Sequence, residues 1–265
     1  MYPPRRIVCL TEETVEALYL MGEDARIVGV SGYAVRPPQV RREKPRVAAF
    51  TSAKIDKILE LEPDLVLTFS DLQAEIVADL VKAGIAVHAF NQRDIAGIFD
   101  MLRMLGGLIG EPEKAEALCT RLETRLAEVR AASAKLPRRP KVYFEEWDDP
   151  MITGIGWVSE LIGIAGGEEC FPQLVKEPSA SNRIITHGDL LAADPDIFIG
   201  SWCGKKFQPD AVRARPGYEA LTAVRTGALH EVKSTIILQP GPAALTDGLE
   251  ALVGIIHGWA AAQAA

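Results

Sequence analysis

The sequence predicts an α/β protein of two Rossmann-like lobes with parallel sheets, joined by one long α-helix, with a ligand cleft between the lobes. The first observation behind this prediction is a repeat. Segments 55–70 (IDKILELEPDLVLTFS) and 187–202 (HGDLLAADPDIFIGSW) both contain a helix end, Pro-Asp and an apolar run. The second is their spacing of 132 residues, almost half of the 265-residue chain. The third is the alternation of strand and helix patterns on both sides of a long helical segment.

The repeated unit predicts a helix that ends just before a buried strand. Pro63 and Pro195 cannot continue a helix, and they bias the residue before them towards extended backbone. The runs that follow, 65–67 and 197–199, lack the polar alternation of a half-exposed strand. Such runs are typical of strands that are buried on both faces of a parallel sheet.

Residues 1–110 are predicted to form the N-terminal lobe. A helix is expected to begin at Thr11, because the neighbouring acids suit a helix N-terminus, and to end at Gly22. A further helix is expected over 73–83. Besides the run after the first Pro-Asp, strands are expected over 6–10, 27–30 and 86–90.

Residues 111–136 are predicted to form a stiff connecting helix. Pro112 suits a first helical position, apolar residues then recur at helical spacing, and Pro137 is expected to stop the helix. Residues 137–265 are predicted to form the C-terminal lobe. Besides the run after the second Pro-Asp, its strands are expected over 141–144, near Glu231 and over 235–238, and its helices over 157–162 and 243–263.

The composition excludes several kinds of partner. The 36 acidic and 29 basic residues give a net charge of −7, whereas proteins that bind nucleic acids normally carry a basic stripe. We therefore expect no nucleic-acid partner. No stretch approaches the ~20 apolar residues of a membrane-spanning helix. The protein is expected to be a monomer. Widely spaced cysteines and histidines predict neither a disulfide framework nor a metal site.

Aromatic residues gather where the predicted strands end. Ligands of open α/β sheets bind beyond the carboxyl ends of the strands, and only 6% of the chain is aromatic. Aromatic walls with a few polar groups suit a large, flat, amphipathic ligand, although each aromatic side chain could instead pack locally. The candidate ligand-binding residues are Tyr33, Phe50, Phe69, Trp147, Trp202 and Gln239.

Four carboxylates within 145–149 leave two interpretations open. Glu145 and Glu146 could form a metal site or a general acid–base pair, or the segment could be a solvated loop. A hydrolase or metal-dependent enzyme that uses these two residues is therefore an alternative of a different class. The chain lacks the P-loop, dinucleotide-binding, nucleophile-elbow and zinc-protease motifs, so we predict a binding protein without catalytic residues.

Segments spread over the whole chain carry a resemblance to a known family. They are RIVCL (6–10), EALYLMG (16–22), IVGV (27–30), KIDKILELEPDLVL (54–67), AGG (165–167), PD (195–196) and PGP (240–242). With these segments the chain resembles class III periplasmic substrate-binding proteins of ABC importers, the vitamin B12 and ferric-siderophore group. Its likeness is greatest to the cobalamin-binding members.

The resemblance implies a non-catalytic protein that requires no cofactor and binds cobalamin or a related corrinoid in the interlobe cleft. A ferric siderophore or haem is the alternative ligand. The resemblance also implies docking to the membrane subunits of an ABC transporter through one acid on each lobe, and Glu75 and Asp189 fit those places. The family is periplasmic, whereas the lack of a signal peptide would make the protein cytoplasmic if this chain is the full-length product.

Overall fold

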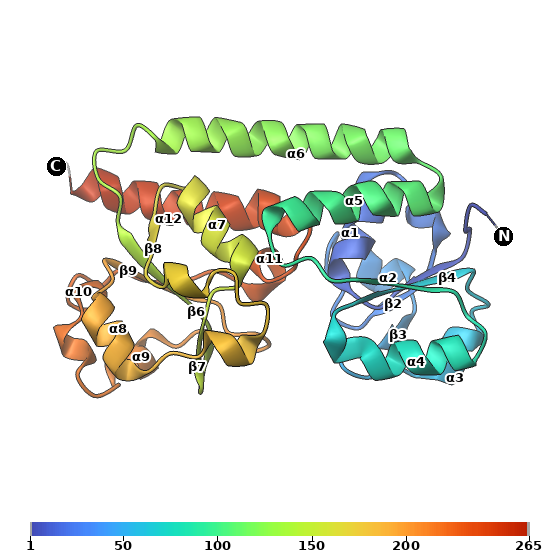
Figure 1. The fold of residues 1–265 in the computed structure, drawn as a ribbon, viewed down its shortest axis with the longest axis horizontal. Coiled ribbons are helices and arrows are strands. Elements are labelled where there is room, and N and C mark those ends of the chain that lie inside the picture. The colour runs from blue at the N-terminus through green and yellow to red at the C-terminus, as the bar shows by residue number, and fades with distance from the viewer. Residues whose placement is uncertain (1, 264–265) are drawn as a thin grey trace. The chain divides into compact units, whose positions relative to one another are not determined.

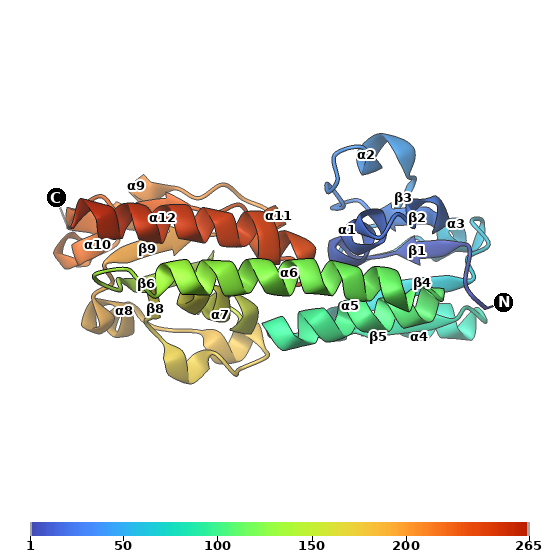
Figure 2. The same ribbon diagram turned by 90° about the horizontal axis from the view of Figure 1, so that it is seen from above.

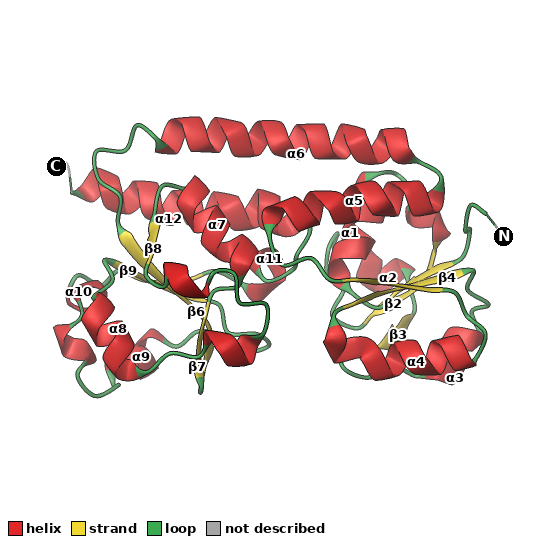
Figure 3. Cartoon of the chain, in the orientation of Figure 1, coloured by secondary structure: helices red, strands yellow, loops and turns green. Residues whose placement is uncertain are grey.

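The computed structural model describes residues 2–263, which form two compact units. Unit 1 comprises the chain up to Gln92 together with Ala96–Arg121, and unit 2 comprises Arg93–Ile95 together with the chain from Leu122 onwards. Each unit contains one β-sheet with helices on both faces (Figures 1 and 3). Two such sheets confirm the predicted α/β class.

The sheet of unit 1 has five parallel strands in the order β3-β2-β1-β4-β5. These strands are β1 (Ile7–Cys9), β2 (Ile27–Ser31), β3 (Arg46–Ala48), β4 (Leu65–Phe69) and β5 (Val87–Phe90). The helices that precede the long connector are α1 (Glu12–Leu20), α2 (Val40–Glu43), α3 (Ile55–Leu59), α4 (Ala74–Lys82) and α5 (Ile95–Ile109).

Helices cover both faces of the unit 1 sheet. On one face Ile58 of α3 and Leu80 of α4 pack against Val8 and Val66 of the central strands. Helices α1 and α5 lie on the other face (Figure 1). All residues of β1 and β4 are buried as a result, which explains why their sequences are continuously apolar.

The sheet of unit 2 has the order β10-β9-β6-β7, and β8 also pairs with β6. Its core contains Tyr143, Leu190 and Phe198. The strands are β6 (Lys141–Asp148), β7 (Met151–Thr153), β8 (Glu168–Glu169), β9 (Ile197–Gly200) and β10 (Leu229–Glu231). The helices are α7 (Gly156–Ile164), α8 (His187–Ala193), α9 (Pro209–Arg213), α10 (Thr222–Arg225), α11 (Ser234–Ile237) and α12 (Leu249–Ala262).

Unit 2 differs from the prediction in two places. Strand β7 runs antiparallel to β6, because only Asp149 and Pro150 connect the two strands, and a connection this short cannot return the chain for parallel pairing. The predicted strand over 235–238 is helix α11, so that prediction was wrong. Its β-branched residues favour a strand, but the Leu238 N–H donates to the Ser234 carbonyl at 2.9 Å and closes a helical turn.

The longest helix is α6 (Pro112–Ser133), with 22 residues, and it lies within the predicted connecting segment. Figure 2 shows it as one unbroken helix. The division between the two units falls inside this helix, between Arg121 and Leu122. Among residues 2–263, no helix is both long enough and apolar enough to span a membrane.

The repeated Pro-Asp unit has the same structural role in both sheets. The carboxylate of Asp64 accepts hydrogen bonds from the Arg5 and Arg6 N–H groups at 2.7 and 3.0 Å, just before β1. Asp196 accepts from the Lys141 N–H at 2.9 Å, at the start of β6. These backbone donors lower the pKa of Asp64. Each aspartate therefore joins the strand that follows it to the first strand of its sheet.

Candidate functional site

At the carboxyl end of the unit 1 sheet, one buried glutamine holds three loops together. The Gln73 Oε1 accepts from the Phe69 N–H at 3.0 Å, and its Nε2 donates to the carbonyls of Leu10 at 3.2 Å and Phe50 at 2.8 Å. These loops follow β4, β1 and β3. Gln73 thus brings the backbones of Phe50 and Phe69, two predicted ligand-binding residues, to one place.

The predicted aromatic residues of unit 1 differ in exposure. Tyr33, two residues beyond β2, is 56% exposed, whereas Phe69 is 7% exposed. Phe50 is half-buried. Tyr33 therefore offers much more surface to a ligand than Phe69 does.

Two carboxylates that the sequence analysis assigned to a helix start are buried at this same end of the sheet. Glu12 and Glu13 begin α1, and both residues are buried. Burial, and then the charge of Glu12, raises the pKa of Glu13 to about 8, although its carboxylate accepts from the Thr11 hydroxyl at 2.6 Å. Burial also raises the pKa of Glu12. Glu12 and Glu13 follow a buried strand closely in the sequence, and this position could have indicated that their carboxylates are buried.

At the carboxyl end of the unit 2 sheet, Glu145 is the centre of a buried polar network. Its carboxylate accepts from the Arg215 guanidinium at 2.7 and 2.8 Å, from Trp202 Nε1 at 2.9 Å and from the Tyr143 hydroxyl at 3.1 Å. Although burial opposes it, Glu145 raises the pKa of Arg215. The charge of Glu145 is thereby satisfied inside the unit.

Two other acids of this segment, Glu146 and Asp148, also have cationic partners. Arg183, which is buried, donates to Glu146 at 2.7 Å, and Lys205 lies 2.5 Å from Asp148. Within the described part of the chain, no group of three or more potential ligands could hold a metal ion. Glu145 and Glu146 are held in ion pairs with Arg215 and Arg183. Neither an acid–base pair nor a solvated loop therefore describes them.

The two predicted tryptophans of unit 2 meet at one lysine. Lys205 Nζ lies 4.4 Å from the centroid of the Trp147 ring and 5.0 Å from that of Trp202. Trp147 is half-buried, whereas Trp202 is only 4% exposed and packs edge-to-face on Phe207. Trp202 is therefore mainly a core residue. Lys205 and Arg215 are not among the site residues predicted from the sequence.

A cavity of about 220 Å³ opens beside Trp202, where β9 and β10 end. Its lining residues are Trp202, Gly204, Lys205, Lys206, Glu231, Val232, Lys233, Ser234 and Thr235. Gln239, the remaining predicted contact, is half-buried just beyond α11 and is not among these lining residues. The structure thus brings Trp147 and Trp202 together, but does not join Gln239 to them.

The two predicted docking acids are both exposed, but they differ in their partners. Asp189 accepts from the Thr186 N–H at 2.8 Å and from its hydroxyl at 2.7 Å, so its carboxylate completes a capping box at α8. Glu75 lies in the first turn of α4, and no hydrogen bond or ion pair of its carboxylate is found among residues 2–263. Glu75 is therefore the acid that remains available to a partner.

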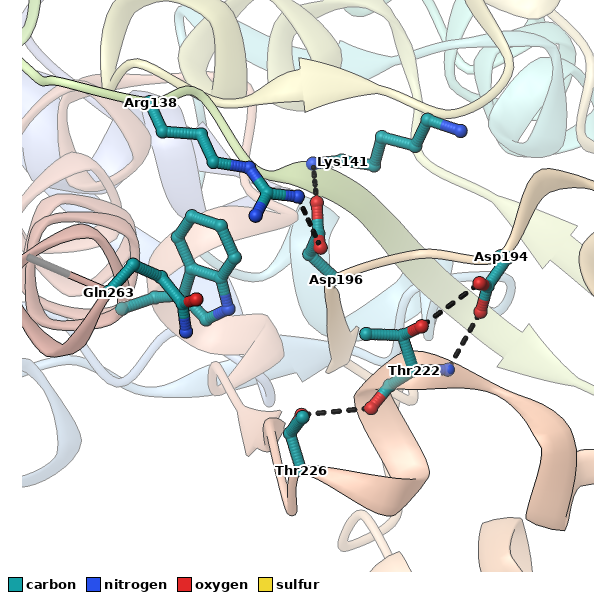
Figure 4. Close-up of a pocket in the computed structure, with 8 residues that line it drawn as sticks. Arg138, Lys141, Asp194, Asp196, Thr222, Thr226 and Gln263 are labelled. Carbon is teal, nitrogen blue, oxygen red and sulfur yellow. Dashed lines mark hydrogen bonds and ion pairs between the residues drawn. The ribbon is translucent and has the colours of Figure 1, made fainter.

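A second cavity, of about 320 Å³, lies at the opposite end of the unit 2 sheet, where β6 and β9 begin (Figure 4). Asp194 accepts from the Thr222 N–H at 2.7 Å and from its hydroxyl at 2.9 Å, and Asp196 accepts from Arg138 at 3.2 Å. These hydrogen bonds hold the segments before β6 and β9 in place, which gives the two aspartates a structural role. The carboxyl ends of the strands, where ligands of such sheets bind, therefore remain the candidate site.

The α/β fold and the ion-paired carboxylates favour a binding protein. The sequence profile described as "Periplasmic binding protein" matches residues 7–235. The chain belongs to this family, whose members are not enzymes, and this confirms the predicted class.

Named relatives and a solved structure are similar over most of the chain. An uncharacterized ABC transporter substrate-binding lipoprotein of Bacillus subtilis is 22% identical over 96% of this chain and 80% of its own length. A vitamin B12-binding protein of Vibrio cholerae is 27% identical over 72% of this chain and 76% of its own. A periplasmic heme-binding protein from Pseudomonas aeruginosa superposes with a TM-score of 0.79 at 23% identity, covering 96% of this chain and 93% of that one. The last likeness shows the fold alone.

Proposed function

We propose that the protein is the substrate-binding component of an ABC importer and that its substrate is cobalamin or a related corrinoid. The observation that carries the proposal is the set of aromatic side chains at the carboxyl ends of the sheets, with Tyr33 exposed and Trp147 and Phe50 half-buried. The similar proteins named for vitamin B12 binding and for ABC transport support the same function. A corrinoid is a large, flat and partly apolar ligand, which suits aromatic contacts.

The proposed contacts are the six residues that the sequence analysis selected, but they contribute unequally. Tyr33 and Trp147 present ring surface, and we assign most of the affinity to them. Phe69 and Trp202 are buried, so each can offer only a small part of its surface to a ligand. Phe50 and Gln239 are half-buried like Trp147, but their side chains are smaller than its indole, so each can add a smaller contact.

The protein is proposed to release its ligand without altering it chemically. Glu145 and Glu146 lie in ion pairs with Arg215 and Arg183, so neither carboxylate is available as a general base. No cofactor is required, because the corrinoid is the cargo. The protein is proposed to act as a monomer.

Delivery is proposed to involve docking of Glu75 to a cation on the membrane subunits of the importer. A protein with this task works outside the cytoplasm, as a periplasmic or lipid-anchored protein. The family is described as periplasmic and the Bacillus subtilis relative as a lipoprotein, and both descriptions support that location.

The proposal is tested by mixing the protein with cyanocobalamin, haem or a ferric siderophore and separating it by gel filtration. Cyanocobalamin absorbance is expected to co-elute with the protein at the volume of a monomer. Co-elution of haem or of the siderophore instead would replace the corrinoid by that ligand while leaving the importer role intact. Co-elution of none of the three would contradict the proposed ligand class.

A further inference from the structure

The cavity beside Trp202 is lined by more positive than negative charge. Three lysines line it, Lys205, Lys206 and Lys233, and one acid, Glu231. A carboxylate oxygen of Glu231 is engaged, because it accepts from the Phe207 N–H at 3.1 Å. The balance in the lining is therefore positive, in a protein whose net charge is −7.

Three of the four acids in the neighbouring segment 145–149 are already paired with cations, and the fourth, Asp149, does not line the cavity. Glu145 and Glu146 are neutralised by Arg215 and Arg183, and Asp148 is paired with Lys205. Lys206 and Lys233 are exposed, and among residues 2–263 no ion pair involves either of them. Two ammonium groups at this end of the sheet therefore remain for an outside anion.

The dimensions of the cavity limit what it can hold. A volume of about 220 Å³ is smaller than the ~300 Å³ at which pockets for whole drug-sized ligands begin. The cavity can therefore hold one group of a larger ligand. Trp202 and Val232 supply apolar lining, and Ser234 and Thr235 supply hydroxyls that can donate to oxygen.

We infer that this cavity is a subsite for an anionic oxygen group of the ligand, either a phosphodiester or a carboxylate. Lys206 and Lys233 bind that group as point charges, and the hydroxyls of Ser234 and Thr235 complete its hydrogen bonds. The assignment of the group to a corrinoid or a haem rests on the proposed function. The presence of the anion subsite does not rest on the proposed function. The subsite and the source of its anion are therefore tested in separate experiments.

The first experiment uses inorganic phosphate as the probe and amide NMR shifts of Ser234 and Thr235 as the readout. These shifts are expected to saturate in the wild-type protein with a Kd of about 1 mM, and to be lost in the double variant Lys206→Gln/Lys233→Gln. The matched control, Lys135→Gln/Lys176→Gln, removes two lysines of the same unit outside the cavity and is expected to behave like the wild type. The inference would be overturned if the wild type showed no saturable shifts or if the double variant retained them. This outcome does not depend on whether the protein binds a corrinoid.

The second experiment identifies the source of the anion. Cyanocobalamin carries a phosphodiester that cobinamide lacks, and haem carries carboxylates that its dimethyl ester lacks. For whichever pair binds, the affinity of the double variant for the anionic ligand is expected to be about tenfold lower than that of the wild type. Its affinity for the ligand without the anionic group is expected to be unchanged. Equal losses within a pair would overturn the inference. Failure of all four ligands with intact phosphate shifts would overturn only the proposed ligand class.

Discussion

Glu145 and Arg215 form a bidentate ion pair inside unit 2, with oxygen–nitrogen distances of 2.7 and 2.8 Å. Glu145 is completely buried, and the pair joins β6 to the segment after α9. A buried carboxylate with such a partner is a structural element, and this relationship accounts for an acidic segment that otherwise resembles an enzyme site.

Arg215→Ala is expected to lower the free energy of unfolding by about 3–5 kcal/mol, because it leaves the buried Glu145 charge without its partner. Urea unfolding measures this loss. The control is Arg213→Ala, which removes an exposed pair with Asp210 and is expected to cost less than about 1 kcal/mol. Equal losses in the two variants would show that the buried pair has no special structural role.

Trp202→Ala is expected to destabilise the protein by about 3–5 kcal/mol, because it empties a core position beside Phe207. Trp202→Phe keeps much of the packing and removes the hydrogen bond to Glu145, so a smaller loss of about 1–3 kcal/mol is expected. Thermal unfolding of the two variants checks this order. A Trp202→Ala protein with unchanged stability would assign Trp202 to ligand contact alone.

Trp147→Ala is expected to weaken corrinoid binding by about thirtyfold, the effect of losing an aromatic anchor worth about 2 kcal/mol. The melting temperature should stay nearly constant, since the ring is half-buried and its Nε1 donates only to the local Asp149 carbonyl. Calorimetry and thermal unfolding on one sample give both values. Wild-type affinity in this variant would remove Trp147 from the proposed contacts.

The stability of unit 1 is expected to fall as the pH rises from about 4.5 to 8. The pKa of Glu13 is about 8 in the folded protein, above its ordinary value of 4.5, so the folded state holds a proton that the unfolded chain releases. The loss should reach about 1.4 kcal/mol per pH unit. Glu13→Gln should flatten this slope in urea unfolding at pH 5, 6, 7 and 8. Parallel slopes for wild type and variant would rule out Glu13 as the source.

Glu75→Lys is expected to abolish docking to the importer while leaving corrinoid affinity unchanged, because a surface charge governs encounter with a partner more than the contacts of a distant ligand. Asp189→Asn is expected to lower stability by about 1 kcal/mol through the helix cap, with little effect on docking. Transporter ATPase stimulation and ligand titration measure the two effects. Normal stimulation with Glu75→Lys would reject the docking role.

The sequence predicts the sheets because their strands have unusual local patterns. The run after Pro63 and the run after Pro195 are buried on both faces, and both form central strands. The segment 235–238 misleads because β-branched residues favour strands, whereas a single hydrogen-bonded turn decides its actual structure. Local pattern therefore predicts strands well in the interior of a sheet and poorly near its ends.

The site is harder to predict because its partners are distant in the sequence. Arg215 lies 70 residues from Glu145, and Gln73 reaches a carbonyl 63 residues away at Leu10. No periodicity in the chain indicates such pairs. The aromatic residues could be selected from their places after strands, but their burial depends on three-dimensional packing, which separates Trp147 from Trp202.

Calorimetric titration with cyanocobalamin shows whether the protein binds a corrinoid as its transport substrate. One binding site per chain with a Kd of about 1 μM or lower is expected. An absence of heat at protein concentrations of about 50 μM, with no cobalamin co-eluting in gel filtration, would contradict this expectation.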